Sequence, residues 1–284
     1  MKIRKAVIPA AGFGTRFLPA TKAQPKEMLT VIDKPLIQYS VEEAVSSGIK
    51  DICIILSRGK SSIEDYFDKS PELESFLEEK GKTDYLKEVQ RISDLAEFCY
   101  IRQKQALGLG HAILMAEKFI GDEPFAVLLP DDIFDCRSPA VQQIIHVYEE
   151  FGSSVVILKR INREETKMYG VIDPEKVKPG VFRLKDMIEK PGPERAFSDL
   201  GIIGRYVFNP DIFNAIRKTK PDHRGEIQIT DAIKILLEKE PVYGYLFEGR
   251  RYDAGDKAGY LEATIELALK RPEFKKIIQD IKIE

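Results

Sequence analysis

Short apolar runs alternate with segments of helical periodicity along most of this chain. The runs are consistent with buried strands and cover residues 3–10, 52–57, 98–102, 125–129 and 154–158. Between them, residues 36–47 and 138–151 carry apolar side chains at helical spacing. This alternation predicts an α/β fold, with a doubly wound, mixed and mainly parallel sheet that has helices on both faces.

Three further segments have other patterns. Residues 61–95 are charged and helix-like, which predicts a helical excursion over the sheet edge with a mostly solvated surface. Residues 170–208 contain shorter β-like runs and predict a β extension of the sheet. Residues 256–284 read as two helices with apolar stripes, which can form a subunit interface or pack back on their own domain. Without a repeat or low-complexity linker, we expect a single domain over residues 1–284.

Composition and charge limit the classes of partner. The chain has 284 residues, of which 43% are hydrophobic, so it can bury a substantial core. A net charge of −2 indicates no nucleic-acid partner and no anionic membrane. No apolar segment approaches the ~20 residues needed to span a bilayer, and the first apolar run is too short for a signal peptide. Cys53, Cys99 and Cys136 lack paired spacing, which fits a reduced cytoplasm, so we expect a cytoplasmic protein.

The loop after the first apolar run combines glycines with cations. Gly12 and Gly14 permit a tight turn whose backbone N–H groups can face an anion. Arg16 and Lys26 place two positive charges beside that turn, and Thr15 adds a small donor. The pattern predicts a phosphate-binding loop.

Two familiar phosphate motifs do not fit this loop. The dinucleotide fingerprint G-x-G-x-x-G needs its third glycine where Phe17 stands, and Pro19 prevents a helix from starting directly afterwards. A Walker A motif needs a glycine five residues before Gly59-Lys60, where the chain has Ile54. Spacing alone therefore leaves open an ordinary βα loop with solvated charges.

The motif set resembles that of sugar-nucleotide pyrophosphorylases, which join a sugar 1-phosphate to a nucleoside triphosphate. The run GFGTRFLPATKAQPKEM at 12–28 resembles their signature, and further matches follow in the same order over most of the chain: DKPLIQY at 33–39, RQ at 102–103, GLGHA at 108–112, LPDD at 129–132, YGVID at 169–173, EKP at 189–191, IIGRYV at 202–207, GEIQITDAI at 225–233 and YDAGDKAGY at 252–260. The similarity is greater to the uridylyl-transferring branch than to the thymidylyl or adenylyl branches.

This resemblance implies a Rossmann-like nucleotidyltransferase fold, with UTP and glucose 1-phosphate as substrates and Mg²⁺ as cofactor. It implies that residues 1–160 mainly bind nucleotide and that 161–255 mainly bind sugar phosphate, while helices over 256–284 provide a possible oligomer contact. We expect a homo-oligomer, either a dimer or a tetramer.

The implied reaction is displacement at the α-phosphorus by a sugar phosphate oxygen. A phosphate monoester has a second pKa of about 6 and is largely ionised at neutral pH, so no catalytic base is required. The site must instead supply alignment and charge neutralisation. The chain agrees, since it has only three histidines and no G-x-S-x-G elbow.

The acids and cations of the motifs receive specific roles. Asp131 follows a buried strand and is our expected Mg²⁺ ligand, although a helix cap or turn is the alternative explanation. By resemblance Asp253 is the second metal acid, and a turn aspartate before a glycine is again the alternative. We expect Arg16 and Lys26 to contact the triphosphate and Lys190 to be the sugar-phosphate cation.

The remaining positions follow from the resemblance. Glu189 would accept hydrogen bonds from sugar hydroxyls, while Gly170 and Gly204 would line the sugar. Gln103 would read the uracil edge, because an amide both donates and accepts, and Gly108 would support the base. Ala11, Gly12, Gly14 and Thr15 complete the nucleotide site. His111 is expected to orient a loop rather than to catalyse.

Other functions stay open at this point. A pyrophosphorylase for dTTP or another sugar 1-phosphate differs little, since one methyl group is worth about 1–3 kcal/mol in an apolar pocket. A catalytically silent sugar-nucleotide sensor would lack a cation or a metal acid, but all five charged positions are present. A nicotinamide dehydrogenase is disfavoured by Phe17 and Pro19.

Overall fold

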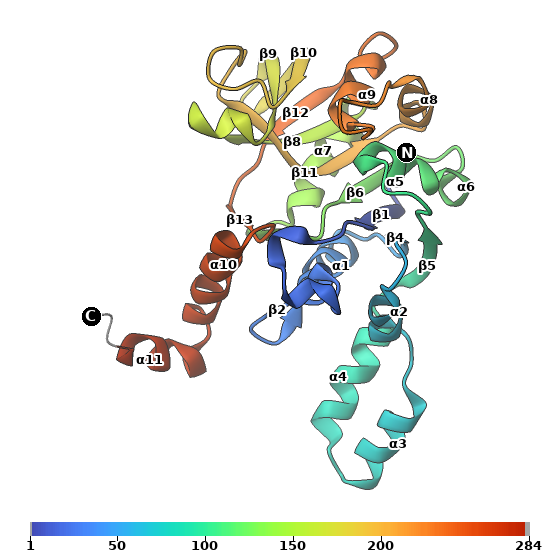
Figure 1. Ribbon diagram of the computed structural model, residues 1–284, viewed down its shortest axis with the longest axis vertical. Helices are drawn as coiled ribbons and strands as arrows, with labels where there is room; N and C mark the ends of the chain where they lie inside the picture. The colour runs from blue at the N-terminus through green and yellow to red at the C-terminus, as the bar shows by residue number, and fades with distance from the viewer. Residues whose placement is uncertain (1, 282–284) are drawn as a thin grey trace.

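A nine-stranded mixed sheet forms the centre of the computed structural model, which describes residues 2–281 (Figure 1). In spatial order its strands are β5 (Glu97–Arg102), β4 (Asp51–Leu56), β1 (Lys5–Ala10), β6 (Phe125–Leu128), β11 (Leu200–Phe208), β8 (Val155–Arg160), β12 (Tyr243–Leu246), β10 (Val181–Glu189) and β9 (Gly170–Lys178). The five strands predicted from apolar runs are all present, with their ends within two residues of the predicted ones.

Strand direction divides the sheet into two parts. Strands β5, β4, β1 and β6 pair in parallel, as expected for a doubly wound sheet. Beyond β6 the pairing becomes mostly antiparallel, because β11 runs against β6, β8 and β9, and β10 runs against β9 and β12. Strands β8 and β12 are parallel. Parallel pairing thus predominates only in the first part, and residues 170–208 form the predicted β extension.

Helices cover both faces of the sheet. One face packs against α5 (Gly108–Met115), α8 (Asp211–Lys218) and α9 (Ile229–Leu236), while the other packs against α1 (Leu36–Ser46), α2 (Ser61–Phe67) and α7 (Ala140–Phe151). Successive residues of β1 point to opposite faces, so Val7 joins the first apolar cluster and Ile8 the second. Both faces are buried, which explains why the strands read as continuous apolar runs.

Two helical appendages leave the central layers (Figure 1). Helices α3 (Pro71–Glu79) and α4 (Thr83–Ser93) form the predicted excursion and project as a hairpin. Near the carboxyl terminus of the chain, α10 (Lys257–Leu269) packs Ala263 into a third apolar cluster, and α11 (Pro272–Asp280) follows it. Leu261, Ile265 and Ile277 stay exposed on these helices. The carboxyl-terminal stripes therefore pack back only in part.

Short elements complete the chain. They are the 3-10 helices η1 (Thr15–Phe17), η2 (Ala20–Lys22), η3 (Lys26–Met28) and η4 (Glu164–Lys167), the helix α6 (Glu117–Ile120), and the two-stranded pairs β2 (Thr30–Val31) with β3 (Lys34–Pro35) and β7 (Asp132–Asp135) with β13 (Arg250–Asp253). In residues 2–281, every helix is too short or too polar to cross a membrane.

The loops that follow β1, β4, β5 and β6 all emerge from one edge of the sheet, because these strands are parallel. In open α/β sheets, ligands bind beyond this carboxyl edge. The phosphate-binding loop predicted after β1 and the two aspartates after β6 therefore lie on the same side of the molecule, as the sequence indicated.

Candidate active site

Two adjoining cavities open at this edge. The cavity nearer the first loop has a volume of about 420 Å³ and is lined by all six predicted nucleotide residues, Ala11, Gly12, Gly14, Thr15, Gln103 and Gly108, together with Lys26. The second, of about 540 Å³, is lined by Arg16, Gly170, Glu189, Lys190, Gly204 and Asp253. Asp131 lines both. The structure thus brings every predicted site residue to one connected space.

The glycine loop owes its shape to Gly14. Its φ of +66° lies in the left-handed region, and a Cβ there would stand 3.1 Å from the Lys26 Cβ and 3.2 Å from Thr21 Cγ2. The Thr21 hydroxyl donates to the Gly14 carbonyl at 2.8 Å and closes the turn. At Gly12, by contrast, no described atom lies within 4 Å of such a Cβ. The loop therefore leaves room for a ligand above Gly12.

Lys26 and Asp131 form an ion pair between the two predicted motifs. The Lys26 ammonium donates to Asp131 Oδ2 at 2.6 Å across 105 residues of sequence. Burial alone would raise the pKa of Asp131, but Lys26 outweighs burial and lowers it to about 2. Burial likewise opposes the charge of Lys26, yet Asp131 and Glu27 raise the pKa of that lysine. Both groups are therefore charged at neutral pH.

Arg16 and Asp253 converge on the same point as Asp131, beside Gly255. A Cβ on Gly255 would stand 2.9 Å from Asp253 Oδ1, 3.1 Å from Asp131 Oδ2 and 3.3 Å from Arg16 Nη1. The Gly255 N–H also donates to Asp253 Oδ1 at 3.1 Å. Only glycine leaves space for this cluster of two acids and a cation.

The carboxylate oxygens at this point fit a magnesium ion that is held mainly by substrate. Asp131, in the loop after β6, and Asp253, at the end of β13, offer carboxylate oxygens. No group of three or more His, Cys, Asp or Glu side chains suited to a metal occurs within residues 2–281. Mg²⁺ typically takes one or two carboxylates and completes its shell with phosphate and water. This pair of acids has the required chemistry.

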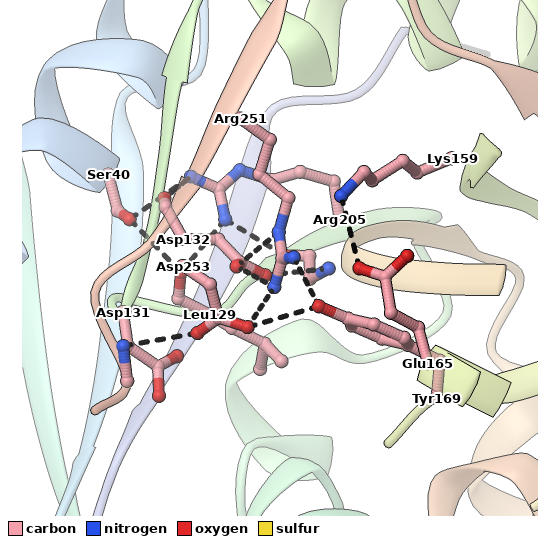
Figure 2. Close-up of polar contacts among 12 residues, drawn as sticks. Ser40, Leu129, Asp131, Asp132, Lys159, Glu165, Tyr169, Arg205, Arg251 and Asp253 are labelled. Carbon is pink, nitrogen blue, oxygen red and sulfur yellow. Dashed lines mark hydrogen bonds and ion pairs between the residues drawn. The ribbon is translucent and has the colours of Figure 1, made fainter. Parts of the chain in front are cut away.

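Sequence reasoning missed a buried arginine in the second cavity. Arg251 donates to Asp132 Oδ1 at 2.6 Å, to the Tyr169 hydroxyl at 2.7 Å and to Asp253 Oδ2 at 2.9 Å (Figure 2). Burial opposes its charge, but the two carboxylates raise the pKa of Arg251. The sequence did carry one signal for Arg251. Residues two apart on a strand point to the same face, so Arg251 lies on the same face of β13 as Asp253.

Asp132 serves the scaffold of the site. It is buried, which raises its pKa despite Arg251, and its Oδ2 accepts from the Gly204 N–H at 2.9 Å. A Cβ at Gly204 would stand 2.1 Å from that oxygen. Gly204 lines the second cavity as predicted, but the contact that requires glycine is the Asp132 carboxylate.

Gly108 has a comparable explanation. Its φ is +89°, and a Cβ there would stand 2.9 Å from the backbone nitrogen of Ile227. The close approach that this glycine permits is to the chain itself, although Gly108 also lines the first cavity. The Gln103 amide donates to the Gly108 carbonyl at 3.2 Å and contacts His111 Nδ1 at 2.9 Å. His111 thus orients Gln103, and burial lowers the pKa of the His111 imidazole.

A second buried acid adjoins Lys26. Glu27 is 1% exposed, lines the first cavity and accepts from Lys60 at 2.7 Å through Oε2. Its other oxygen, Oε1, is buried without a hydrogen-bond partner among the described residues. Burial raises the pKa of Glu27 and lowers that of Lys60. An unpaired buried acceptor of this kind is costly to the folded state.

The cation and acid of the sugar side are neighbours in sequence. Lys190 follows β10 with a φ of +43°, and its ammonium lies 3.1 Å from Glu189 Oε1. The Lys190 N–H donates to the Tyr169 carbonyl at 3.2 Å, which anchors the strand end. Both side chains line the second cavity.

Cations on a glycine loop, paired with acids beyond the parallel strands, define a phosphate-handling α/β enzyme site. A model of the nucleotidyl transferase family matches residues 5–269, and the chain belongs to this family. It is 55% identical to UTP–glucose-1-phosphate uridylyltransferase YngB of Bacillus subtilis (strain 168) over 274 residues, 96% of this chain and 92% of the relative.

Solved structures agree in shape. A UDP-glucose pyrophosphorylase complexed with UDP-glucose superposes with a TM-score of 0.87 at 45% identity, covering 95% of this chain and 100% of that chain. A UTP-bound UGPase from Acinetobacter baumannii gives a TM-score of 0.92 at 38% identity, covering 99% of this chain and 100% of that chain.

Proposed function

We propose that this chain transfers the uridylyl group of UTP to glucose 1-phosphate, which produces UDP-glucose and pyrophosphate. One observation carries the proposal: a nucleotide-sized cavity and a second, sugar-side cavity meet at Asp131. Lys26 contacts this acid from the first cavity, and Arg16 approaches it from the second. The near-full-length uridylyltransferase relative supports the choice of substrates.

The reaction needs alignment more than proton transfer. A phosphate oxygen of glucose 1-phosphate attacks the α-phosphorus of UTP, and the bond to the β-phosphate bridging oxygen breaks as pyrophosphate leaves. Two polyanions must approach each other, so their charge has to be neutralised. Arg16 and Lys26 do this for the triphosphate, and Lys190 does it for the sugar phosphate.

Carboxylates complete the constellation. Asp131 and Asp253 would hold Mg²⁺, which supplies Lewis-acid neutralisation of phosphate charge when bound. Arg251 keeps Asp253 in place through its 2.9 Å contact. Glu189 accepts hydrogen bonds from the sugar hydroxyls at the far side of the second cavity.

The first cavity suits the nucleoside. The Gln103 side chain is held by Gly108 and His111 and reads the uracil edge. Glu27 lines the same cavity beside Lys26. Ala11, Gly12, Gly14 and Thr15 approach the ribose and phosphates with small side chains.

A pyrophosphate-release assay tests the proposal. Purified protein is incubated with Mg²⁺, one of UTP, dTTP, ATP, CTP or GTP, and one of several sugar 1-phosphates. The highest kcat/KM is expected for UTP with glucose 1-phosphate. If that pair gave no turnover while another pair did, the proposed function would be overturned.

In the same assay, Asp131→Asn is expected to lower kcat about 10²–10³-fold. Asp135→Asn serves as the matched control, because Asp135 lies outside both cavities.

A further inference from the structure

Glu189, the acid proposed to bind the sugar, depends on a residue from a distant helix. The Thr230 hydroxyl donates to Glu189 Oε2 at 2.5 Å, although 41 residues separate them in sequence. Thr230 lies in the first turn of α9, is 6% exposed and lines the second cavity beside Glu189. The other oxygen, Oε1, lies 3.1 Å from the Lys190 ammonium.

The backbone of Gly170 completes this arrangement. A Cβ on Gly170 would stand 3.2 Å from both Thr230 Cγ2 and Thr230 Oγ1, and 3.3 Å from Glu189 Oε2. The hydroxyl and the carboxylate are therefore packed together against the start of β9. Glycine at 170 leaves the space in which the Thr230–Glu189 hydrogen bond forms.

We propose that Thr230 is a positioning residue that fixes the Glu189 carboxylate for the sugar hydroxyls, and so sets the affinity for the sugar 1-phosphate. This inference rests on the proposed function. Thr230 holds Oε2 while Oε1 lies beside the Lys190 ammonium, so the carboxylate is fixed in one orientation. Each carboxylate oxygen still has a lone pair for a sugar hydroxyl.

The physical basis is the strength of charge-assisted hydrogen bonds. A neutral donor to a carboxylate contributes more than a neutral pair does, and its loss is felt wherever the carboxylate must keep one orientation. Thr230 does not reach the nucleotide cavity, because it lines only the second one. Its effect should thus be confined to the sugar substrate.

The test compares Thr230→Val with Thr230→Ser. Valine keeps the shape and removes the donor, while serine keeps the donor. We expect Thr230→Val to raise the KM for glucose 1-phosphate about tenfold, with the KM for UTP within about twofold, and Thr230→Ser to restore near wild-type values. The matched control is Thr219→Val, which removes an equally buried threonine hydroxyl just after α8, where it donates to the Ala215 carbonyl.

Two further measurements separate positioning from general damage. In a Glu189→Ala background, where the Thr230 hydroxyl has no carboxylate to bind, adding Thr230→Val should change the KM for glucose 1-phosphate less than twofold. By calorimetry, Thr230→Val should weaken binding of UDP-glucose about tenfold and leave binding of UDP unchanged.

Equal losses for both substrates, or an unchanged KM for glucose 1-phosphate, would overturn the role of Thr230. The failure of the proposed function would look different. In that case the wild-type protein itself would release no pyrophosphate from UTP and glucose 1-phosphate, whatever residue stands at 230.

Discussion

At the scale of single residues, the site keeps its own charges paired. Lys26 contacts Asp131, while Arg251 contacts both Asp132 and Asp253. These cations and acids thus neutralise each other inside the protein. In the proposed reaction, substrate phosphate would replace Asp131 as the partner of Lys26, which costs less than keeping isolated buried charges.

This pairing predicts an unusual effect of Lys26→Met on metal binding. Turnover should fall, but the protein without nucleotide should bind Mn²⁺, a probe for Mg²⁺, more tightly than the wild type does. The reason is that the lysine no longer occupies Asp131 Oδ2. Titration followed by electron paramagnetic resonance measures it, with the exposed Lys22→Met as control. Weaker or unchanged Mn²⁺ binding in Lys26→Met would refute the competition.

The same pair predicts a pH dependence of stability. The pKa of Asp131, about 2 rather than 3.8, means that its ionised form favours the folded state above pH about 4. That contribution is lost as pH falls towards 2. When the pH falls from 6 to 3, the unfolding free energy of the wild type should therefore drop by about 1 kcal/mol more than that of Asp131→Asn. Urea unfolding at both pH values measures it, and a constant difference would contradict the assignment.

At the scale of elements, one buried arginine joins the parts that carry the site. Arg205 of β11 is fully buried and donates to Glu43 of α1 at 2.7 Å. It also donates to the carbonyls of Leu129 and Asp132 at 2.8 and 2.9 Å, which flank Asp131 on both sides (Figure 2). Arg205 thus fixes the loop after β6, although it lines neither cavity.

Arg205→Met should consequently destabilise the fold by about 3–5 kcal/mol, since it leaves the Glu43 carboxylate buried without its main partner. The double variant with Glu43→Gln should lose less than the sum of the two single changes, because it carries no unpaired charge. Glutamine keeps an acceptor for the Val141 N–H that Glu43 binds at 2.8 Å. Chemical unfolding of the four proteins measures the cycle, and simple additivity would argue against the ion pair.

Much of the architecture could be read from the sequence, and the reason is local. Continuous apolar runs such as 52–57 become parallel strands because both faces are covered, and periodic segments become the helices on those faces. The antiparallel pairing of β11 with β6 could not be derived, since long-range strand order is not encoded in local pattern.

The residues that line the cavities were predictable, but the contacts that hold them in place were not. Arg16, Lys26 and Asp131 were found because each stands in a loop beside a strand end. Arg251 and Thr230 were missed, because their importance comes from partners that are distant in sequence. For Gly204 the predicted position was right, but only the structure identifies the Asp132 carboxylate that demands glycine there.

At the scale of the whole molecule, the site lies where the parallel and antiparallel parts of the sheet meet. The loops after β1 and β6 bring Arg16, Lys26 and Asp131 to the cavities. Lys190 follows β10 of the antiparallel part, whereas Asp253 ends β13, which pairs with β7 outside the main sheet. We infer that both substrates are held on a rigid sheet, which suits a reaction that depends on alignment.

The most direct measurement is a crystal structure of this chain with UDP-glucose. We predict uracil beside Gln103 and Glu27, the glucose beside Glu189, and the diphosphate between Asp131 and Lys190. Ligand density in another part of the molecule, or a base lying in the cavity of Glu189, would contradict this prediction.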